Sequence, residues 1–265
     1  MTSIPQTTSA AGGAGRALRY LYRVPLLLWL LLVALPLVLL TMVPPLAPLR
    51  VGDESLRHWS VRRWSGALMR LFGLRTRRVG TPLPGAAMFV ANHVSWVDIE
   101  VLHSQRMMGF VAKREIRGWP VVGWLAARGE TIFHKRGDTR SLDGVMEAMV
   151  ERLREGRAVG VFPEGGTRGG AELGPFHARI FQPAVEAQVP VQPVALRYGE
   201  RGGAQTVVAF AAGESFFANF LRLLGEPARP VDVCFLEPIA PAQFEMGRRA
   251  MAETARRRIL AALAG

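Results

Sequence analysis

The chain has very little cysteine: Cys234 is the single thiol in 265 residues. Neither a disulfide framework nor a cysteine metal site can form within such a chain. Cys234 stands in an apolar, strand-like run and is interpreted as a small buried hydrophobic residue. The GxSxG elbow, the P-loop, the HExxH pair and the GxGxxG fingerprint are absent as well, as is any internal repeat. The sequence therefore gives no support to a serine hydrolase or a nucleotide-binding fold.

Acidic residues are also scarce, with 21 Asp and Glu against 33 Lys and Arg, which gives a net charge of +12. A balance of this kind indicates a nucleic acid, an anionic membrane surface or phosphorylated substrates. Nucleic acid is the weakest of these, because the chain has no recognised binding motif and no aromatic platform for base stacking. We therefore expect a membrane partner and no nucleic acid.

The N-terminal region predicts membrane association. Residues 1–15 are rich in Ser, Thr, Ala and Gly and are expected to be disordered. Residues 24–43 form an uncharged run of 20 residues, about the length that crosses a bilayer core of ~30 Å. Pro36 is expected to kink or break this helix. We favour a retained membrane segment over a signal peptide, because the run is long and no small-residue cleavage site follows cleanly.

A second helix is predicted over residues 56–72, with most apolar side chains on one arc and arginines opposite. Its tryptophans suit an interfacial membrane helix, but a helix packed on the core of its own domain fits equally well. Arginines flank the apolar run 24–43 on both sides, so the positive-inside rule gives no orientation. A single span and a re-entrant hairpin both remain open. Together these features define a membrane-associated helical segment over residues 16–80.

From about residue 81 to 265, short apolar runs alternate with helical patterns. The predicted strands are 88–92, 109–112, 131–134, 158–162, 191–196, 207–211 and 231–236. The predicted helices are 96–105, 121–127, 142–155, 180–187, 216–224 and 241–263. This alternation predicts a single α/β domain with a mixed, roughly seven-stranded sheet flanked by helices.

His93 and Asp98 follow the first of these strands and have the residue types of a general base and the carboxylate that orients it. Five residues apart on one helix they would point about 140° from each other. They meet only if His93 lies on the loop and Asp98 lies in the first helical turn. Alternatively, Ser95 and Asp98 form a capping box, with His93 bound to backbone.

A second candidate site is the segment 162–170, where a strand enters a glycine-rich loop that carries Glu164, Thr167 and Arg168. Glycines allow backbone N–H groups to approach an anion, and arginine suits bidentate contact with phosphate. The alternative is a flexible surface loop with an exposed arginine. Two further segments, 113–136 and 189–196, carry charged and proline-punctuated motifs around strands.

In this order, the four segments resemble the glycerolipid acyltransferase family, which comprises the lysophospholipid acyltransferases. The matching residues are Asn92, His93 and Asp98; then Lys113, Glu115, Pro120, Gly123, Gly129, Phe133 and Arg136; then Phe162, Pro163, Glu164, Gly165, Thr167 and Arg168; and finally Val189, Pro190, Pro193 and Val194. The resemblance covers residues 85–200, and the extra glycine Gly166 is a departure from the pattern. The N-terminal helices are similar to the membrane-dipping motif of bacterial members.

The resemblance implies acyl transfer from acyl-CoA or acyl-carrier protein to the free hydroxyl of a lysophospholipid at a membrane, without metal or cofactor. The first expected acceptor is 1-acylglycerol-3-phosphate. A lyso-ornithine lipid or another lysolipid is an alternative, and a non-catalytic membrane-anchored protein that binds anionic lipid is an alternative of another class.

In the resemblance His93 is the general base and Asp98 orients it. The residues expected to bind substrate are Lys113, Arg136, Glu164, Gly165, Thr167, Arg168 and Arg179. The expected location is the bacterial inner membrane, with the catalytic domain on the cytoplasmic face.

Overall fold

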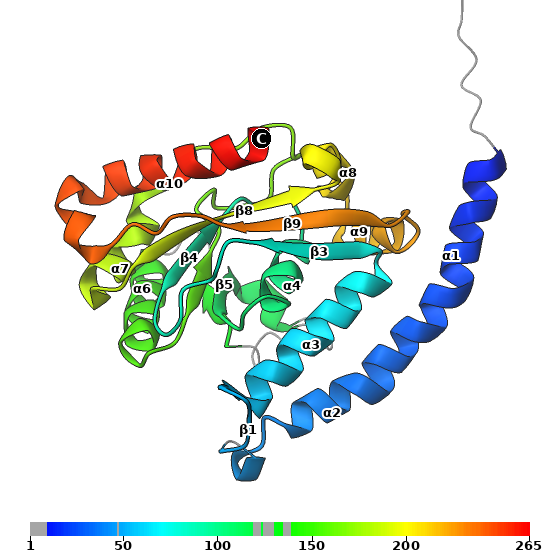
Figure 1. The fold of residues 1–265 in the computed structure, drawn as a ribbon, viewed down its shortest axis with the longest axis horizontal. Coiled ribbons are helices and arrows are strands. Elements are labelled where there is room, and N and C mark those ends of the chain that lie inside the picture. The colour runs from blue at the N-terminus through cyan, green and yellow to red at the C-terminus, as the bar shows by residue number, and fades with distance from the viewer. Residues whose placement is uncertain (1–9, 47, 119–122, 124–129, 135–138) are drawn as a thin grey trace, which may run out of the picture.

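The computed structural model describes residues 10–46, 48–118, 123, 130–134 and 139–265. A central sheet carries helices on both faces, and a long N-terminal helix lies along one side of the body (Figure 1). The strands of the main sheet are β3 (Leu74–Val79), β4 (Met88–Ala91), β5 (Gly109–Lys113), β6 (Ile132–His134), β7 (Val159–Val161), β8 (Val191–Tyr198) and β9 (Arg229–Phe235). A separate hairpin joins β1 (Arg50–Val51) to β2 (Glu54–Ser55).

The strand order of the main sheet is β3-β9-β8-β4-β7-β5-β6. β8 and β9 pair antiparallel, whereas the other neighbouring pairs are parallel. The mixed seven-stranded sheet expected from the sequence is therefore confirmed. Because β4, β7 and β8 run in the same direction, their carboxyl ends meet at one edge of the sheet, where ligands bind in open α/β sheets.

The helices of the domain are α3 (Leu56–Leu71), α4 (Val97–His103), α6 (Thr139–Arg154), α7 (Gln182–Ala187), α8 (Gln205–Val208), α9 (Phe216–Leu224) and α10 (Gly247–Ala264). Short helical turns are η2 (Pro44–Leu46), η3 (Arg114–Gly118), η4 (Ala178–Phe181), η5 (Glu200–Gly202) and η6 (Pro241–Met246). Helix α10 covers one face of the sheet and α3 the other (Figure 1).

Strand β4 shows why the core has two halves. Its side chains alternate between the two faces of the sheet, as the pleat of a strand requires. Phe89 and Ala91 pack in the cluster that includes α3, α4 and α9. Met88 and Val90 pack in the cluster that includes α6, α7 and α10. Both faces are buried, which explains why this strand is an uninterrupted apolar run in the sequence.

The N-terminal helix consists of α1 (Ala10–Trp29), a π-helical turn η1 (Leu30–Ala34) and α2 (Leu35–Leu40). The wide turn ends two residues before Pro36, whose ring lacks a backbone donor and clashes with the preceding turn of an ordinary helix. Pro36 therefore widens the helix locally, and the helix continues without a break. The stretch Gly13–Leu40 is long and apolar enough to cross a membrane by length and composition.

This N-terminal helix packs on the domain. Leu27, Leu30 and Leu35 are buried, and the Trp64 indole donates to the Leu30 carbonyl at 3.3 Å. The expectation of disorder up to residue 15 fails for residues 10–15, which are helical. Residues 1–9 lie outside the described part of the chain.

Helix α3 resolves one alternative that the sequence left open. Val61, Leu68, Met69 and Leu71 are buried, and the helix packs against α4 and β3. Its apolar face is therefore occupied by the core of its own domain. Strand β3 follows directly and belongs to the main sheet, although its residues fall within the segment 16–80 that the sequence assigned to the membrane-associated region.

The strand predicted over 207–211 is wrong, because Gln205–Val208 form helix α8. Val208 is fully buried there, so a short apolar run fills the core equally well from a helical turn. The helix predicted over 121–127 lies almost wholly outside the described residues. The helix predicted over 241–263 is divided at Gly247, whose φ is 80°, into the short turn η6 and helix α10. The other predicted strands and helices are present with shifts of a few residues at their ends.

Candidate active site

Asn92 terminates strand β4 against β8. Its side-chain amide donates to the Leu196 carbonyl at 3.0 Å, and the Leu196 N–H donates back to the Asn92 side chain at 2.8 Å. The last paired residues of β4 and β8 are Ala91 and Val194. The Asn92 side chain thus satisfies backbone groups of β8 beyond the end of this pairing. The chain can therefore leave the sheet directly after Asn92, which places His93 at the carboxyl edge.

Asp98 performs both tasks that the sequence left as alternatives. Its Oδ2 lies 2.7 Å from His93 Nδ1. The same oxygen accepts the backbone N–H groups of Val94 at 2.7 Å and Ser95 at 2.9 Å. The contact with Ser95 is one half of a capping box. One fully buried carboxylate thus fixes the loop and orients the imidazole.

The second oxygen of Asp98 accepts the hydroxyl of Tyr198 at 2.5 Å. Tyr198 is the last residue of β8 and is fully buried. Burial and the neighbouring Asp98 carboxylate raise the pKa of Tyr198 well above its ordinary value. The phenol therefore stays neutral at physiological pH and serves as a permanent donor to Asp98.

The His93 ring has a defined position because it stacks on Phe162, with ring centroids 3.9 Å apart and an interplanar angle of 11°. Phe162 directly follows β7, the parallel neighbour of β4, so the two strand ends bring the rings together. Asp98 is the one hydrogen-bond partner of the imidazole within the described part of the chain. Nε2 is therefore available to a substrate hydroxyl.

Glu164 is a structural anchor of the site. Its Oε1 accepts the backbone N–H of His93 at 2.9 Å, and its Oε2 accepts that of Gly174 at 2.9 Å. The Arg168 Nε lies 3.5 Å from Oε2, and the Arg168 N–H donates to the His93 carbonyl at 3.1 Å. The glycine-rich loop is thereby tied to the histidine loop at both its beginning and its middle.

Helix α10 holds the far end of the same loop. Arg256 donates through Nε to the Gly174 carbonyl and through a terminal nitrogen to the Leu173 carbonyl, both at 2.8 Å. Gly174 in turn donates to Glu164, which accepts from His93. This series of hydrogen bonds connects the C-terminal helix to the backbone of the candidate base.

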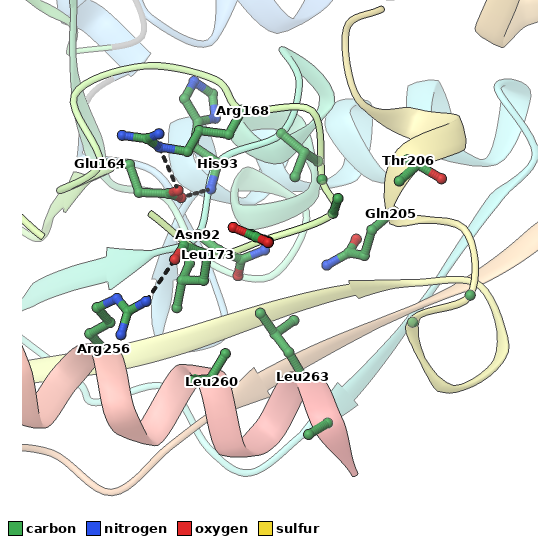
Figure 2. A pocket seen from close by; sticks show the side chains of 17 residues that line it. Asn92, His93, Glu164, Arg168, Leu173, Gln205, Thr206, Arg256, Leu260 and Leu263 are labelled. Atoms are coloured by element: carbon green, nitrogen blue, oxygen red, sulfur yellow. Dashed lines mark hydrogen bonds and ion pairs between the residues drawn. The ribbon is translucent and has the colours of Figure 1, made fainter. Parts of the chain in front are cut away.

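A cavity of about 600 Å³ opens beside His93 (Figure 2). Its lining includes His93, Glu164, Arg168 and Glu172 from the two loops, together with Arg256 from α10. Apolar lining comes from Leu173, Leu260, Leu263 and Ala264. The volume lies within the usual range of small-molecule sites. The cavity therefore offers charged groups of both signs next to the imidazole and an apolar wall along α10.

The remaining residues expected to bind substrate differ in where the structure places them relative to the cavity. Gly165 has a φ of 74° in the turn after Phe162, a conformation that favours glycine. Thr167 is exposed and is not among the described residues that line the cavity. Arg179 on η4 is exposed, pairs with Asp143 of α6 and also does not line it. Lys113 ends β5, its side chain lies outside the described part, and Arg136 lies wholly outside.

Sequence reasoning missed three residues that build the site: Tyr198, Arg256 and Asn219. Asn219 on α9 is fully buried, and its side-chain oxygen accepts the Ser95 hydroxyl at 3.2 Å and the Trp96 indole at 3.1 Å. For Asn219, the local signal was a polar side chain among the mostly apolar residues of α9. Within the described residues, no group of His, Cys, Asp and Glu is arranged to hold a metal ion.

An oriented histidine at a strand end, an anchored glycine-rich loop and a charged cavity lie together at the carboxyl edge of the α/β sheet. Comparison with known proteins identifies the class of protein that carries them. The family model described as "Acyltransferase" matches residues 76–197. The crystal structure of the 1-acyl-sn-glycerophosphate acyltransferase PlsC from Thermotoga maritima superposes with a TM-score of 0.71 at 20% identity, over 96% of this chain and 98% of that one.

Two curated relatives are similar in sequence. A lyso-ornithine lipid O-acyltransferase from Pseudomonas aeruginosa is 36% identical over 212 residues, which is 79% of this chain and 80% of the relative. A 1-acyl-sn-glycerol-3-phosphate acyltransferase from Neisseria gonorrhoeae is 39% identical over 142 residues, covering 53% of this chain and 56% of the relative. The chain belongs to the acyltransferase family. It is an enzyme of that class, which sets aside the non-catalytic alternative.

Proposed function

We propose that the protein transfers a fatty acyl group from a thioester donor to the free hydroxyl of a lysolipid at a membrane surface. The observation that carries this proposal is the 2.7 Å contact between His93 Nδ1 and Asp98 Oδ2, next to the cavity. It leaves Nε2 to act as a general base on a hydroxyl.

In the proposed mechanism, Nε2 of His93 takes the proton of the acceptor hydroxyl while its oxygen attacks the thioester carbonyl. The new C–O bond forms as the C–S bond breaks, and the imidazolium returns its proton to the leaving thiolate. Asp98 fixes the tautomer through Nδ1 and stabilises the imidazolium. No acyl-enzyme is needed, because the thioester is already activated. The donor is acyl-CoA or acyl-carrier protein.

The acceptor headgroup is proposed to lie against Arg168, which lines the cavity beside His93. Glu164 then acts by positioning, because its two oxygens already accept backbone N–H groups. Lys113, Arg136, Gly165, Thr167 and Arg179 remain predictions for further substrate contacts. Lysophosphatidate fits a site whose anion is held by arginine.

A lyso-ornithine lipid is the second candidate acceptor, and one feature of the cavity favours it. Arg168 and Glu172 both line the cavity, and ornithine carries a carboxylate and an amine that can pair with one group each. The relative named for that substrate also aligns over a larger share of this chain than the relative named for glycerol phosphate.

The decisive test of the base is His93→Ala, assayed in membranes with a labelled acyl donor. A loss of about 100-fold or more is expected, because general base catalysis contributes 10²–10⁴-fold. Activity within about tenfold of wild type would remove His93 from the mechanism. Arg257→Ala is a matched surface control, because that side chain is exposed and does not line the cavity.

An acceptor panel separates the two candidate substrates. Purified protein is supplied with lysophosphatidate, lyso-ornithine lipid, lysophosphatidylcholine and glycerol-3-phosphate. Arg168→Ala is expected to raise KM for the true acceptor with little change in the donor KM. Glu172→Gln should raise KM for lyso-ornithine lipid alone. An equal response to both acceptors would contradict the pairing of Glu172 with the amine.

We propose that the protein is membrane-associated and lies in one leaflet of the bacterial inner membrane, with its catalytic domain in the cytoplasm. The packing of Leu27, Leu30 and Leu35 on the domain supports this proposal. A helix that crossed the whole bilayer would draw the charged body to which it is docked into the hydrocarbon.

A further inference from the structure

Helix α9 presents an unusual apolar surface. Phe217 and Leu221 lie one helical turn apart on the same face and are 66% and 40% exposed. The opposite side of the helix is buried through Asn219, Leu223 and Leu224. A short helix that exposes a phenylalanine and a leucine on its outer face indicates a contact with something apolar.

This surface continues that of the N-terminal helix. Leu18 and Leu21 of α1 are 62% and 74% exposed, and the neighbouring Tyr20 donates to the Leu221 carbonyl at 2.8 Å. The approach is so close that a Cβ at Gly225 would lie 2.7 Å from the Tyr20 hydroxyl. Glycine is therefore required there, and the outer faces of α1 and α9 form one surface.

Arginines fix the two helices to each other. The Arg19 Nε donates to the Gly225 carbonyl at 2.6 Å, and Arg23 donates to the carbonyls of Leu224 at 2.9 Å and Glu226 at 2.8 Å. These carbonyls lie at the C-terminal end of α9, where the helix dipole favours cations. When α1 lies in a membrane surface, α9 is therefore held at the same level.

The inner side of α9 contacts the catalytic loop. Asn219 accepts from Ser95 and Trp96, which lie between His93 and Asp98 in the sequence. Trp96 also stacks on Phe220, with centroids 5.5 Å apart and an interplanar angle of 27°. One short helix thus connects the exposed apolar surface to the loop that holds the candidate base.

We propose that Phe217 and Leu221 of α9 insert into the acyl-chain region of a bilayer as a second membrane contact beside the N-terminal helix. The continuity of the two apolar faces supports a lipid occupant, and the net charge of +12 favours an anionic surface. The role of this contact rests on the proposed function: it places the His93 loop at the depth where a lysolipid is withdrawn from the membrane.

The test uses the full chain with Phe217→Ser and Leu221→Ser combined. Its partition onto vesicles of phosphatidylethanolamine and phosphatidylglycerol is expected to fall about tenfold or more, since two apolar side chains lose their burial in lipid. The matched control combines Val79→Ser and Met246→Ser, which remove apolar side chains that are 50% and 43% exposed elsewhere on the surface. The control should bind vesicles as wild type does.

Kinetics test the functional consequence separately. The α9 variant is expected to lose activity on lysolipid embedded in vesicles while its rate on a monomeric short-chain lysolipid stays within about twofold of wild type. Vesicle partition equal to that of the control overturns the membrane contact, whether or not the protein transfers acyl groups. A change from dimer to monomer in sedimentation, with partition unchanged, assigns the surface to a second copy and also overturns it.

Discussion

Tyr198→Phe tests the central inference about the site, that a phenol from the sheet holds the carboxylate that orients the base. The substitution removes one hydroxyl and keeps the ring. In the wild type that hydroxyl donates to Asp98 Oδ1 at 2.5 Å, and both residues are fully buried. Within the described residues, Oδ1 of Asp98 has no other donor, so the variant leaves half of a buried carboxylate unpaired.

The expected cost follows from this geometry. A hydrogen bond to a charged group contributes about 1.5–3 kcal/mol, and no water replaces the donor easily in a fully buried site. For a chain of this size, that loss corresponds to a fall in Tm of roughly 3–12 °C. The effect on kcat should be below about tenfold, because Oδ2 still holds His93, Val94 and Ser95.

Thermal unfolding in detergent, followed by circular dichroism, measures the change in Tm, and steady-state kinetics measures the change in kcat. Tyr20→Phe is the matched control, since its hydroxyl bonds to a neutral carbonyl at an exposed position and should cost below about 0.5 kcal/mol. Equal Tm changes in the two variants would refute the reasoning. A kcat loss of about 100-fold with normal folding would instead place the phenol in the chemistry.

Further predictions concern the supports around the site. Arg256→Gln should lower kcat with little change in either KM, because it releases the loop that anchors His93. The control is Arg257→Gln, at the neighbouring exposed position, which should leave kcat unchanged. A selective rise in one KM in the Arg256 variant would indicate direct ligand contact. Hydrogen bonds from Arg222 lower the pKa of Glu214 to about 2. The ionised Glu214 carboxylate therefore contributes fully to the free energy of unfolding above about pH 4.5, and this contribution is lost as pH falls towards 2. Tm measured against pH should show the advantage of wild type over Glu214→Gln disappearing in that interval, and an advantage that persists at pH 2 would contradict the ion pair.

Helix α9 illustrates what local sequence can specify. Its predicted limits, 216–224, agree with the observed Phe216–Leu224. The Ser215 hydroxyl accepts the Ala218 N–H at 3.2 Å, a cap encoded by one residue at the start of the helix. Signals of this kind act within one turn, so they need no knowledge of distant contacts.

Strand β3 illustrates the opposite case. The segment Leu74–Val79 is rich in arginine and lies at one end of the sheet, where most of its side chains are exposed. It pairs with β9, and Arg77 donates to Asp232 at 2.7 Å from the other strand. An edge strand with solvent-facing charges has little hydrophobic pattern, so its assignment depends on a partner distant in sequence.

By itself, the sequence determined the order of the four motifs, the α/β class and the candidate base, because the residues of each motif lie close together along the chain. Tertiary structure alone decided that Asp98 caps its helix and also holds His93, and that Tyr198, 100 residues away, is its second partner. The register of β4 with β8 brings Tyr198 to this position. Burial then excludes water, so the carboxylate takes its hydrogen bonds from whichever protein donors the fold places around it.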